Sequence, residues 1–545
     1  MGESALGQSS GPDQSKASID ARQRRPKAAV GLLKLRLRRD GGGQPLYQQL
    51  RDEIRAAVLG GGLGVDIRLP SERELARALG INRATVVRAY QELVEEGLVT
   101  RRGSRGTVLN DGLESGDRVA HPEHEDETPA WLFDVAAHTG LGDLGPDPTL
   151  LRELAVSGSR PGMIPFAAAG PGPDMVPLDG LRASLEEALD DWGVEPLRYG
   201  PVEGFPPLLA ALRARYTGDI IGRQDDVMVV SGATQGIEVV ARALLQPGDE
   251  VIVEAPAYVG TIQGLGRVGA RLIGVPVDQS GVRVDLIENV LSRRRIRLIA
   301  VQPTFHNPTG VTLSPTRRQH LLALAKRFAV PIFEDDPYRL LAYDGAPALP
   351  LKALDRDGSV IYLSSFSKCL ASGLRVAWIA AHRAVLSRLV LAKQFSDLNS
   401  AGPPQAAVAK FLTSARFDTH LDWSLGLYRE RRNAVVEELS AAWPEAVPMG
   451  QPKGGFHIWT RLPAPGTARQ VMAAAARHGV SVVAGVAFYP PNVLGRDAGQ
   501  DFLRLSFPEV TPEMAREGVR RLREAIAEVS ALSTEAGGLG SRVLV

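Results

Sequence analysis

The chain has 545 residues, which is too long for one hydrophobic core and predicts roughly two to four domains. Its 44% hydrophobic and 23% charged content is ordinary for a globular protein, and Cys369 is the only cysteine, which excludes an intramolecular disulfide and a cysteine-rich zinc site and indicates a reducing compartment. The net charge of +1 is unevenly divided, because residues 1–110 hold 19 Lys and Arg against 12 Asp and Glu, a net +7, and the remainder therefore carries −6.

Residues 1–43 are rich in Ser, Gly, Gln and Arg and end in three glycines, which predicts a disordered basic arm. The first 20 residues lack the basic-then-apolar order of a secretion signal. No apolar run in the chain reaches membrane-spanning length. We therefore expect a cytoplasmic protein without membrane association.

Residues 44–109 predict a helix, a helix-turn-helix and a two-stranded wing. A first helix is indicated by apolar residues at four-residue spacing from Leu46 to Val58, and a capping box at residues 71–74 predicts a second helix that Gly80 ends. Asn82 is expected to cap a third helix with a buried stripe. Two short alternating strands, 98–100 and 106–109, then enclose an arginine-rich turn.

The polar residues of this module point to DNA. Arg83 lies in the first turn of the third helix, where it could bond a guanine edge, while arginines in the wing suit phosphates or the minor groove. Surface arginines are usually only solvated, but here they gather on one predicted face. The candidate DNA contacts are Arg73, Asn82, Arg83, Thr85, Arg88, Arg101, Arg102 and Arg105.

Three motifs in the module carry a family resemblance. They are Leu-Pro-Ser-Glu-Arg-Glu-Leu-Ala at 69–76, Thr-Val-Val-Arg-Ala-Tyr at 85–90 and Glu-Gly-Leu-Val at 96–99. Together they resemble the GntR family of bacterial regulators, and the resemblance covers about residues 44–109. It implies a winged helix-turn-helix that binds a double-stranded DNA operator.

Residues 110–162 predict an acidic linker followed by a bridging helix. Residues 110–129 contain seven acidic residues against one arginine, which favours a solvated segment. A metal site at His121, Glu123, His124 and Glu125 is the alternative, but these residues lack a structured ligand spacing. We therefore predict no metal. Residues 130–160 are expected to be helical.

From about residue 163 to 535, short β-rich apolar runs alternate with helical stretches, which predicts an α/β domain with a parallel sheet. A smaller α/β segment, about 405–533, is expected to form a second subdomain. Within the larger part, Lys368 stands in Ser-Ser-Phe-Ser-Lys, with Arg375 seven residues later. This pattern offers an amine for a Schiff base, hydroxyl donors for a phosphate and a guanidinium to neutralise it, which fits pyridoxal phosphate.

Other parts of such a site occur in order along the chain. The Gly-Ala-Thr loop at 232–234 opens a helix and could hold a phosphate, although this signal alone is weak. Tyr258 could stack on a pyridine ring, but an aromatic residue after a strand is more often part of a core. Asp335 ends an apolar strand, where a carboxylate would keep a pyridinium nitrogen protonated. Arg504 could clamp a substrate carboxylate.

The joint order resembles that of the fold-type I aminotransferases, in particular the kynurenine and α-aminoadipate branch, over residues 165–530. By this resemblance Lys368 is the Schiff-base lysine and Asp335 pairs with the pyridine nitrogen, with Asp336 as a competing candidate. Arg504 and Gly170 would form the substrate pocket, and Tyr199 would reach the phosphate from the partner subunit of a homodimer. The remaining cofactor contacts implied are Ala233, Thr234, Tyr258, Asn307, Tyr338, Ser365, Ser367 and Arg375.

The DNA-binding module and the α/β domain together resemble the MocR subfamily of GntR regulators. Members of this subfamily fuse a winged helix-turn-helix to an aminotransferase-like domain. The resemblance implies a regulator that senses pyridoxal phosphate or an amino compound. Two alternatives stay open at this point. One is a working aminotransferase that carries a DNA-binding appendage, and the other is a regulator that has lost its cofactor, which the complete residue set disfavours.

Overall fold

The structure is a computed structural model, which describes residues 45–59, 69–95, 98–101, 107–109, 162–443, 445–463, 468–491 and 499–540. The chain divides into two compact units, Met1–Gly140 and Leu141–Val545. The predicted arm, the acidic linker with its histidines, and wing residues Arg102 and Arg105 lie outside the described residues. Within the described parts, no helix combines the length and apolar character that a membrane span requires.

The first unit contains the predicted helices and strands. Its elements are α2 (Leu46–Leu59), α3 (Glu72–Leu79), α4 (Arg83–Glu95), β1 (Val99–Arg101) and β2 (Thr107–Leu109). Strands β1 and β2 are antiparallel, with Thr100 opposite Val108. The side chain of Ser71 accepts a hydrogen bond from the Glu74 amide at 3.3 Å, and the Glu74 carboxylate accepts one from the Ser71 amide at 3.0 Å. The predicted capping box is therefore confirmed.

Local signals explain why this unit folds as it does. Gly80 adopts a left-handed conformation, with φ of 60°, and ends α3, while Asn82 Oδ1 accepts from the Ala84 amide at 2.9 Å at the start of α4. The hydroxyl of Tyr90 donates to the carbonyl of Pro70 at 2.9 Å, which ties α4 to the segment before α3. A single core holds the three helices to the strands; its residues include Leu50, Ile54, Leu75, Val86, Tyr90, Leu93 and Val99.

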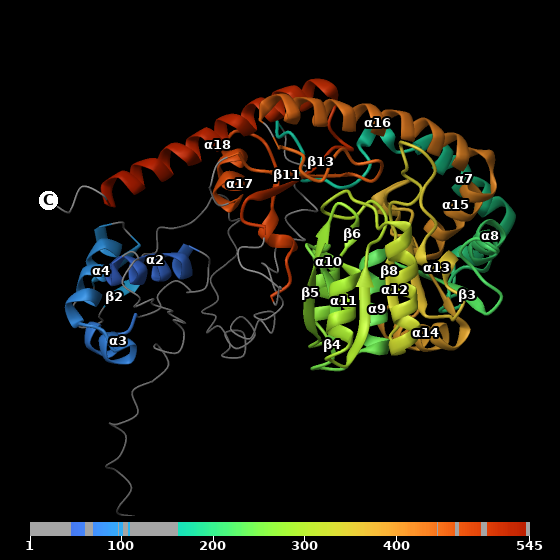
Figure 1. The fold of residues 1–545 in the computed structure, drawn as a ribbon, viewed down its shortest axis with the longest axis horizontal. Helices are drawn as coiled ribbons and strands as arrows, with labels where there is room; N and C mark the ends of the chain where they lie inside the picture. The colour runs from blue at the N-terminus through green and yellow to red at the C-terminus, as the bar shows by residue number, and fades with distance from the viewer. Residues whose placement is uncertain are drawn as a thin grey trace, which may run out of the picture. The chain divides into compact units, whose positions relative to one another are not determined.

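The second unit is built on an eight-stranded sheet of order β3-β10-β9-β8-β7-β4-β5-β6 (Figure 1). Its strands are β3 (Asp225–Val230), β4 (Glu250–Ala255), β5 (Arg271–Asp278), β6 (Gly281–Val282), β7 (Ile296–Val301), β8 (Ile332–Asp335), β9 (Val360–Ser365) and β10 (Ala377–His382). The inner strands from β9 to β5 are parallel, as predicted. The predicted parallel sheet does not extend to the outer strands, because β10 is antiparallel to both β3 and β9 and β6 is antiparallel to β5.

Helices cover both faces of this sheet. Alternate strand residues point to opposite sides: Val251 and Val253 pack with α9, α10 and α14, whereas Ile252 packs with α11 and α12. The helices of this part are α7 (Leu178–Trp192), α8 (Pro206–Tyr216), α9 (Ala233–Leu244), α10 (Val259–Gly266), α11 (Val284–Leu291), α12 (Pro315–Phe328), α13 (Leu351–Leu354), α14 (Arg383–Asp397) and α15 (Gly402–Thr413), with short 3-10 turns η3 (Pro173–Met175), η4 (Glu195–Leu197) and η5 (Ser372–Leu374).

A smaller sheet forms the carboxyl-terminal subdomain. Its order is β11-β13-β12, with β11 at His457–Arg461, β12 at Val483–Ala484 and β13 at Phe502–Ser506, and all pairs are antiparallel. The helix α17 (Ala468–Arg477), the turn η6 (Gly485–Phe488) and two long helices, α16 (Ala415–Ala442) and α18 (Pro512–Gly540), complete it. In Figure 1, α16 and α18 run together above this sheet.

Candidate cofactor site and DNA-reading face

The carboxyl ends of the parallel strands gather the residues predicted to bind a cofactor. Asp335 is the last residue of β8, Lys368 follows β9, and Asn307 follows β7. Tyr258 caps α10 after β4, and Ala233 begins α9 after β3. Ligands bind at this edge in open α/β sheets, because the loops after the strands converge there.

Lys368 has the environment of a reactive amine. Its Nζ donates to the carbonyl of Ala169 at 2.6 Å. Burial, reinforced by the positive charges of Arg504 and Arg375, lowers the pKa of Lys368 to about 8, although the carboxylate of Asp335 opposes this effect. A larger neutral fraction near physiological pH is what a lysine needs in order to act as a nucleophile.

Asp335 and Asp336 have different surroundings, which bears on the choice between them. Asp335 Oδ2 accepts from Gln302 Nε2 at 3.1 Å, while its Oδ1 is buried without a partner. Burial and the neighbouring Asp336 raise the pKa of Asp335 to about 7. Asp336 Oδ1 is also buried without a partner, but Asp336 accepts from the Tyr362 hydroxyl at 3.1 Å and interacts with Arg339, whereas only Asp335 acts electrostatically on Lys368. The geometry favours Asp335 as the residue that faces a bound ring.

Gln302 is a site residue that the sequence analysis missed. Its side chain donates to Asp335, and its Oε1 accepts from the Asn307 amide at 2.5 Å. Its own amide donates to Glu254 at 2.8 Å, and Glu254 lies 3.2 Å from the ring of His306. Gln302 therefore holds the carboxylate and the asparagine loop together. A polar residue directly after a buried parallel strand was the signal available for it.

A cradle for a phosphate lies beside the lysine. The hydroxyl of Ser365 donates to Ser367 at 3.0 Å, and both residues are buried. Arg375 has a left-handed backbone, with φ of 53°, which is uncommon outside glycine, and its guanidinium lies against the carbonyl of Ser231. Gly232 has a φ of 88°, a conformation that favours glycine, and a Cβ there would displace that guanidinium. Ala233 and Thr234 open α9 at this point.

Arg504 occupies the middle strand of the small sheet and is buried. One of its terminal nitrogens donates to the carbonyl of Ala167 at 2.7 Å, its guanidinium lies 5.3 Å from the ring centroid of Phe488, and its Nε has no partner. Burial lowers the pKa of Arg504 to about 10. An arginine held in this way is prepared to bind a carboxylate. Gly170 lies near Ser372, because a Cβ on it would be 3.5 Å from the serine hydroxyl.

Two tyrosines complete the site at the edge of the ring position. Tyr258 interacts electrostatically with Asp335, Arg504 and Arg375, and burial raises its pKa. The hydroxyl of Tyr338 is 2.9 Å from Nε2 of His457, a residue of β11 that the sequence analysis did not single out. An isolated histidine within an apolar strand gives no signal of a site in the sequence.

The residues present fit a pyridoxal phosphate group. A buried polar atom without a partner occurs at a position that such a group would contact, because Asp335 Oδ1 is available for the ring nitrogen. Unpaired buried polar atoms are rare in proteins and call for a partner. When bound, the group would supply an electron-withdrawing ring, and the phosphate cradle and Lys368 would hold it.

Tyr199 is not brought to this site within one chain. Its side chain is 88% exposed, and it lines a surface hollow with Leu197, Asp397 and Asn399. Asp397 accepts from the Ser231 hydroxyl at 3.3 Å, so the hollow adjoins the phosphate loop.

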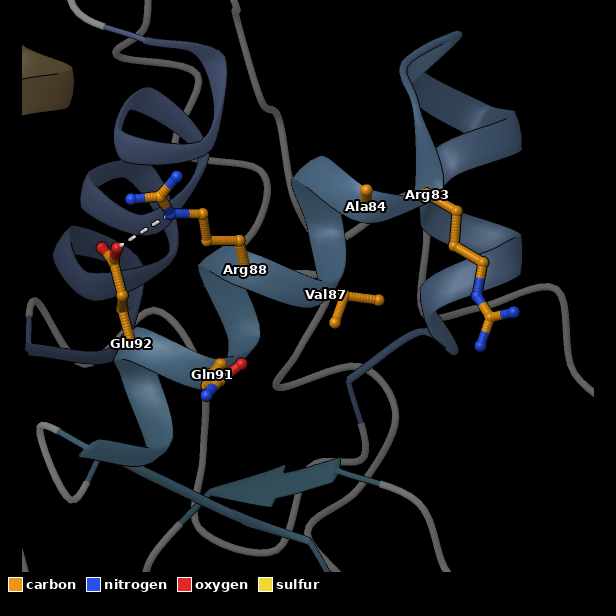
Figure 2. Close-up of a pocket in the computed structure, with 6 residues that line it drawn as sticks. All are labelled: Arg83, Ala84, Val87, Arg88, Gln91 and Glu92. Atoms are coloured by element: carbon orange, nitrogen blue, oxygen red, sulfur yellow. Dashed lines mark ion pairs between the residues drawn. The ribbon is translucent and has the colours of Figure 1, made fainter.

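Two of the DNA-reading candidates, Arg83 and Arg88, lie on one face of α4, where a shallow depression is lined by Arg83, Ala84, Val87, Arg88, Gln91 and Glu92. Figure 2 shows the side chains of Arg83 and Arg88 extending to opposite sides of this face, with Val87 between them. Arg83 pairs with Glu72 at 3.1 Å and keeps 54% of its side chain exposed. A small apolar residue flanked by two arginines is a suitable surface for a major groove.

The other predicted DNA contacts differ in how far their side chains are already engaged in contacts within the protein. Arg88 lies over the ring of Tyr47, 3.9 Å from its centroid, and is 3.6 Å from Glu92, so it also holds α2 to α4. Asn82 uses its carbonyl oxygen as a cap, which leaves only its amide nitrogen for DNA. Thr85 is partly exposed and Arg73 is exposed. The backbone of Arg101 pairs with Thr107 in the wing, and its side chain lies outside the described residues.

Comparison with known proteins supports both halves. Residues 181–522 match the model of aminotransferase class I and II, and residues 46–109 match that of bacterial regulatory proteins of the gntR family. The chain is 35% identical to aromatic-amino-acid aminotransferase 1 of Thermococcus litoralis, over 71% of this chain and 93% of that protein. It is 30% identical to the HTH-type transcriptional regulator YisV of Bacillus subtilis, over 76% of this chain and 84% of that protein.

The same relationship appears among solved structures. Kynurenine aminotransferase of Pyrococcus horikoshii, solved in complex with PMP, superposes with a TM-score of 0.67 at 33% identity, covering 73% of this chain and 99% of that one. Pyridoxal phosphate, the cofactor predicted from the sequence, is the cofactor of this class, so that prediction is confirmed for the family. The predicted fold, a winged helix-turn-helix with a fold-type I aminotransferase-like domain, is confirmed as well. The chain belongs to the aminotransferase class I and II family and, through its gntR-type reader, has the architecture of the MocR-type regulators.

Proposed function

We propose that this protein is a transcriptional regulator that binds pyridoxal phosphate at Lys368 and adjusts its binding to a DNA operator when an amino compound enters the same site. The observation that carries the proposal is the joint presence of a complete cofactor site and an exposed reading helix in one chain. The site combines a lysine of lowered pKa with an unpaired buried oxygen at Asp335. A DNA-binding regulator also supports the cytoplasmic location that we expected.

In this proposal each residue has a separate task. Asp335 holds the ring nitrogen, Asn307 and Tyr338 donate to the ring oxygen, and Tyr258 stacks on the ring. Arg504 binds the carboxylate of the effector, and Gly170 leaves room for it. The phosphate is held by Ala233, Thr234, Ser365, Ser367 and Arg375. The effect on DNA requires that the effector has unequal affinity for two arrangements of the protein, because a ligand cannot otherwise shift an equilibrium.

The direct test of this function combines spectra with operator binding. The full-length protein, loaded with pyridoxal phosphate, is titrated with candidate amino acids while its absorption band and its affinity for upstream DNA fragments are followed. We expect one compound to change both signals at the same concentration. A spectral change that leaves DNA affinity the same for every compound would contradict the regulatory function.

A homodimer is part of the proposal, and the exposed surface around Tyr199 supports it. Leu197, which lines the same hollow, is 67% exposed, and Phe395, two residues before the lining residue Asp397, is 84% exposed. Such apolar exposure is unusual on a monomer and marks an interface. Sedimentation of the purified protein should therefore give twice the chain mass of 58.4 kDa, and Phe395→Asp should lower it toward that of one chain. A wild-type protein that sediments as a single chain would exclude this arrangement.

A working aminotransferase is the second candidate, and the completeness of the site favours keeping it. The residues that the aminotransferase resemblance requires are all present in the sequence: Lys368, Asp335, Asn307, Tyr338 and Arg504. An enzyme should convert its cofactor to pyridoxamine phosphate in the presence of an amino acid and release a keto acid. A sensor should hold the amino acid without releasing that product, so product analysis distinguishes the two functions.

The assignment of Asp335 leads to a prediction with a matched control. Asp335→Asn removes a charged hydrogen bond to the ring nitrogen and should weaken cofactor binding about ten- to hundredfold. Asp336→Asn should leave cofactor affinity within about threefold of the wild type, because Asp336 accepts from Tyr362. Cofactor affinity is measured by fluorescence titration of the apoprotein. The reverse ranking would identify Asp336 as the ring partner.

The reading helix gives a second prediction. Arg83→Ala should cost about 1–3 kcal/mol on the specific operator and relax the choice of one base pair in each half-site. Arg101→Ala, in the wing, should weaken specific and non-specific DNA alike and lower the salt slope by about one. Arg77→Ala, an exposed arginine of α3 outside the predicted contacts, is the control. Mobility-shift assays over a salt series measure the affinity of each variant for specific and non-specific DNA. If Arg83→Ala weakened binding to all sequences equally, α4 would not be the helix that selects bases.

A further inference from the structure

Three buried side chains form a hydrogen-bonded chain from the cofactor site into the small sheet. The hydroxyl of Tyr338, which follows β8, is 2.9 Å from Nε2 of His457 on β11. Nδ1 of the same ring is 3.0 Å from the hydroxyl of Ser506 on β13. His457 and Ser506 are fully buried and lie opposite each other in the sheet register. The chain therefore joins the large subdomain, which carries Lys368, to the small one.

The direction of these hydrogen bonds depends on which nitrogen of His457 carries the proton. Burial, together with the charges of Arg504 and Lys368, lowers the pKa of His457 well below its usual value, so the ring is neutral and has one N–H. With the proton on Nδ1, His457 donates to Ser506 and accepts from Tyr338. With the proton on Nε2, Ser506 donates to His457, which donates to Tyr338 and leaves the tyrosine proton free.

A count of protons distinguishes the two arrangements. In the described part of the structure, His457 is the only hydrogen-bond partner of the Ser506 hydroxyl and of the Tyr338 hydroxyl. The first arrangement leaves the serine proton without an acceptor at a fully buried position, which is costly. The second leaves the tyrosine proton available on the side of the cofactor site, where a ring oxygen or a water accepts it.

We propose that His457 is a positioning residue that carries its proton on Nε2 and thereby holds Tyr338 as a hydrogen-bond donor toward the ring oxygen of the cofactor. The inference rests on the proposed function, since it deepens the role given to Tyr338. Burial raises the pKa of Tyr338, so the tyrosine keeps the proton that it donates.

The hydrogen bonds through His457 also connect Tyr338, beside the ring oxygen, to β13, the strand that carries Arg504. Ser506 and Arg504 lie two residues apart on β13, and the amide of Ser506 donates to the carbonyl of Phe166 at 2.7 Å while Arg504 donates to the adjacent carbonyl of Ala167. A carboxylate bound by Arg504 acts on the same strand and the same neighbouring segment. His457 thus links effector binding in the small subdomain to the hydrogen bond that adjusts the cofactor.

Two substitutions at His457 test the role, because each keeps one half of the ring's contacts. In His457→Gln the amide nitrogen can replace Nε2 and still donate to Tyr338. In His457→Asn the shorter amide can replace only Nδ1 and reach Ser506. The measurement is the pH titration of the absorption band of the full-length protein loaded with pyridoxal phosphate, with Tyr338→Phe as the reference.

We expect Tyr338→Phe to make the bound chromophore hold its proton about ten- to hundredfold more tightly. The reason is that the charged ring oxygen then loses the hydrogen bond that the tyrosine hydroxyl donates to it. His457→Asn should shift the titration in the same direction, and His457→Gln should titrate like the wild type. Equal shifts in both His457 variants would show a merely structural role and overturn the proposal, as would a wild-type titration in His457→Asn.

The imidazole itself gives a second, independent readout. In full-length protein labelled with 15N-histidine, the signal missing from His457→Gln identifies His457, and its nitrogen shifts should show the proton on Nε2 with and without cofactor. Ser506→Ala, which removes the donor to Nδ1, should allow the proton to move to Nδ1. A proton on Nδ1 in the wild type would overturn the positioning role of His457. A protein that gains no absorption band with pyridoxal phosphate would instead overturn the proposed function.

Discussion

Lys368→Ala should abolish the yellow absorption band that the protein gains with pyridoxal phosphate, while its fold and its DNA affinity remain. The reason is chemical, because Lys368 is the only amine that the structure places among Asp335, Arg375 and Arg504 in the described part of the chain. Borohydride treatment of the wild type should fix the cofactor to the peptide that contains Lys368, as mass spectrometry can show. Exposed Lys326, paired with Asp357, supplies the control Lys326→Ala, which should keep the band.

The same lysine should give a specific pH dependence. Only the neutral amine attacks the cofactor, and with a pKa of about 8 instead of 10.5 about one-tenth of Lys368 is neutral at pH 7. The rate at which the apoprotein captures pyridoxal phosphate should rise with pH and level off above pH 8. Stopped-flow absorbance measures this rate. A rate that keeps rising to pH 10 would mean that burial and the positive charges of Arg504 and Arg375 do not lower the pKa of the amine.

Much of the DNA-binding unit could be predicted because its signals are local. The capping box at Ser71, the left-handed Gly80 and the cap at Asn82 are each set by residues a few positions apart, and they fix where α3 and α4 begin and end. The engagement of Arg88 with Tyr47 could not be foreseen in this way. It depends on how α2 packs against α4, which lies beyond local spacing.

The large sheet was predicted where its strands carry β-branched residues. Strand β10, Ala-Trp-Ile-Ala-Ala-His, was missed because alanine has little preference for strands, and its place is decided by pairing with β3 and β9 on either side. The prediction of a parallel sheet therefore came from the strands that could be recognised, and it did not include the antiparallel strand β10.

The site shows the same division. Residues that carry a charge at a strand end, such as Asp335 and Lys368, were predicted, because each chemical role needs that type of residue. Gln302, His457 and Ser506 were missed, because they act by contacting another site residue from a distant part of the chain. The roles of His457 and Ser506 depend on topology, which places β11 and β13 against the segment after β8, and these two neutral buried side chains have no signature in the sequence.

Arg504→Ala should abolish the response of the absorption band to carboxylate-bearing amino compounds and leave the band itself in place. Loss of one partner of a buried charge pair costs about 2–5 kcal/mol, which corresponds to about thirtyfold to several-thousandfold weaker binding. Arg504 does not contact Lys368 by a hydrogen bond, and its nitrogen bonds the carbonyl of Ala167, so the cofactor linkage should still form. The control is Arg461→Ala, an exposed arginine on β11 near Glu445.

A pair of ligands makes this test specific for the carboxylate. An amino acid that shifts the wild-type band, chosen from a panel with L-2-aminoadipate, L-kynurenine and aromatic amino acids, is compared with the amine that lacks its carboxyl group. The wild type should bind the amino acid far more tightly, because only the carboxylate can occupy the unpaired Nε side of Arg504. Arg504→Ala should bind the two ligands almost equally. Since a general disturbance of the small subdomain would weaken both ligands together, retained discrimination in Arg504→Ala would assign the carboxylate to another cation.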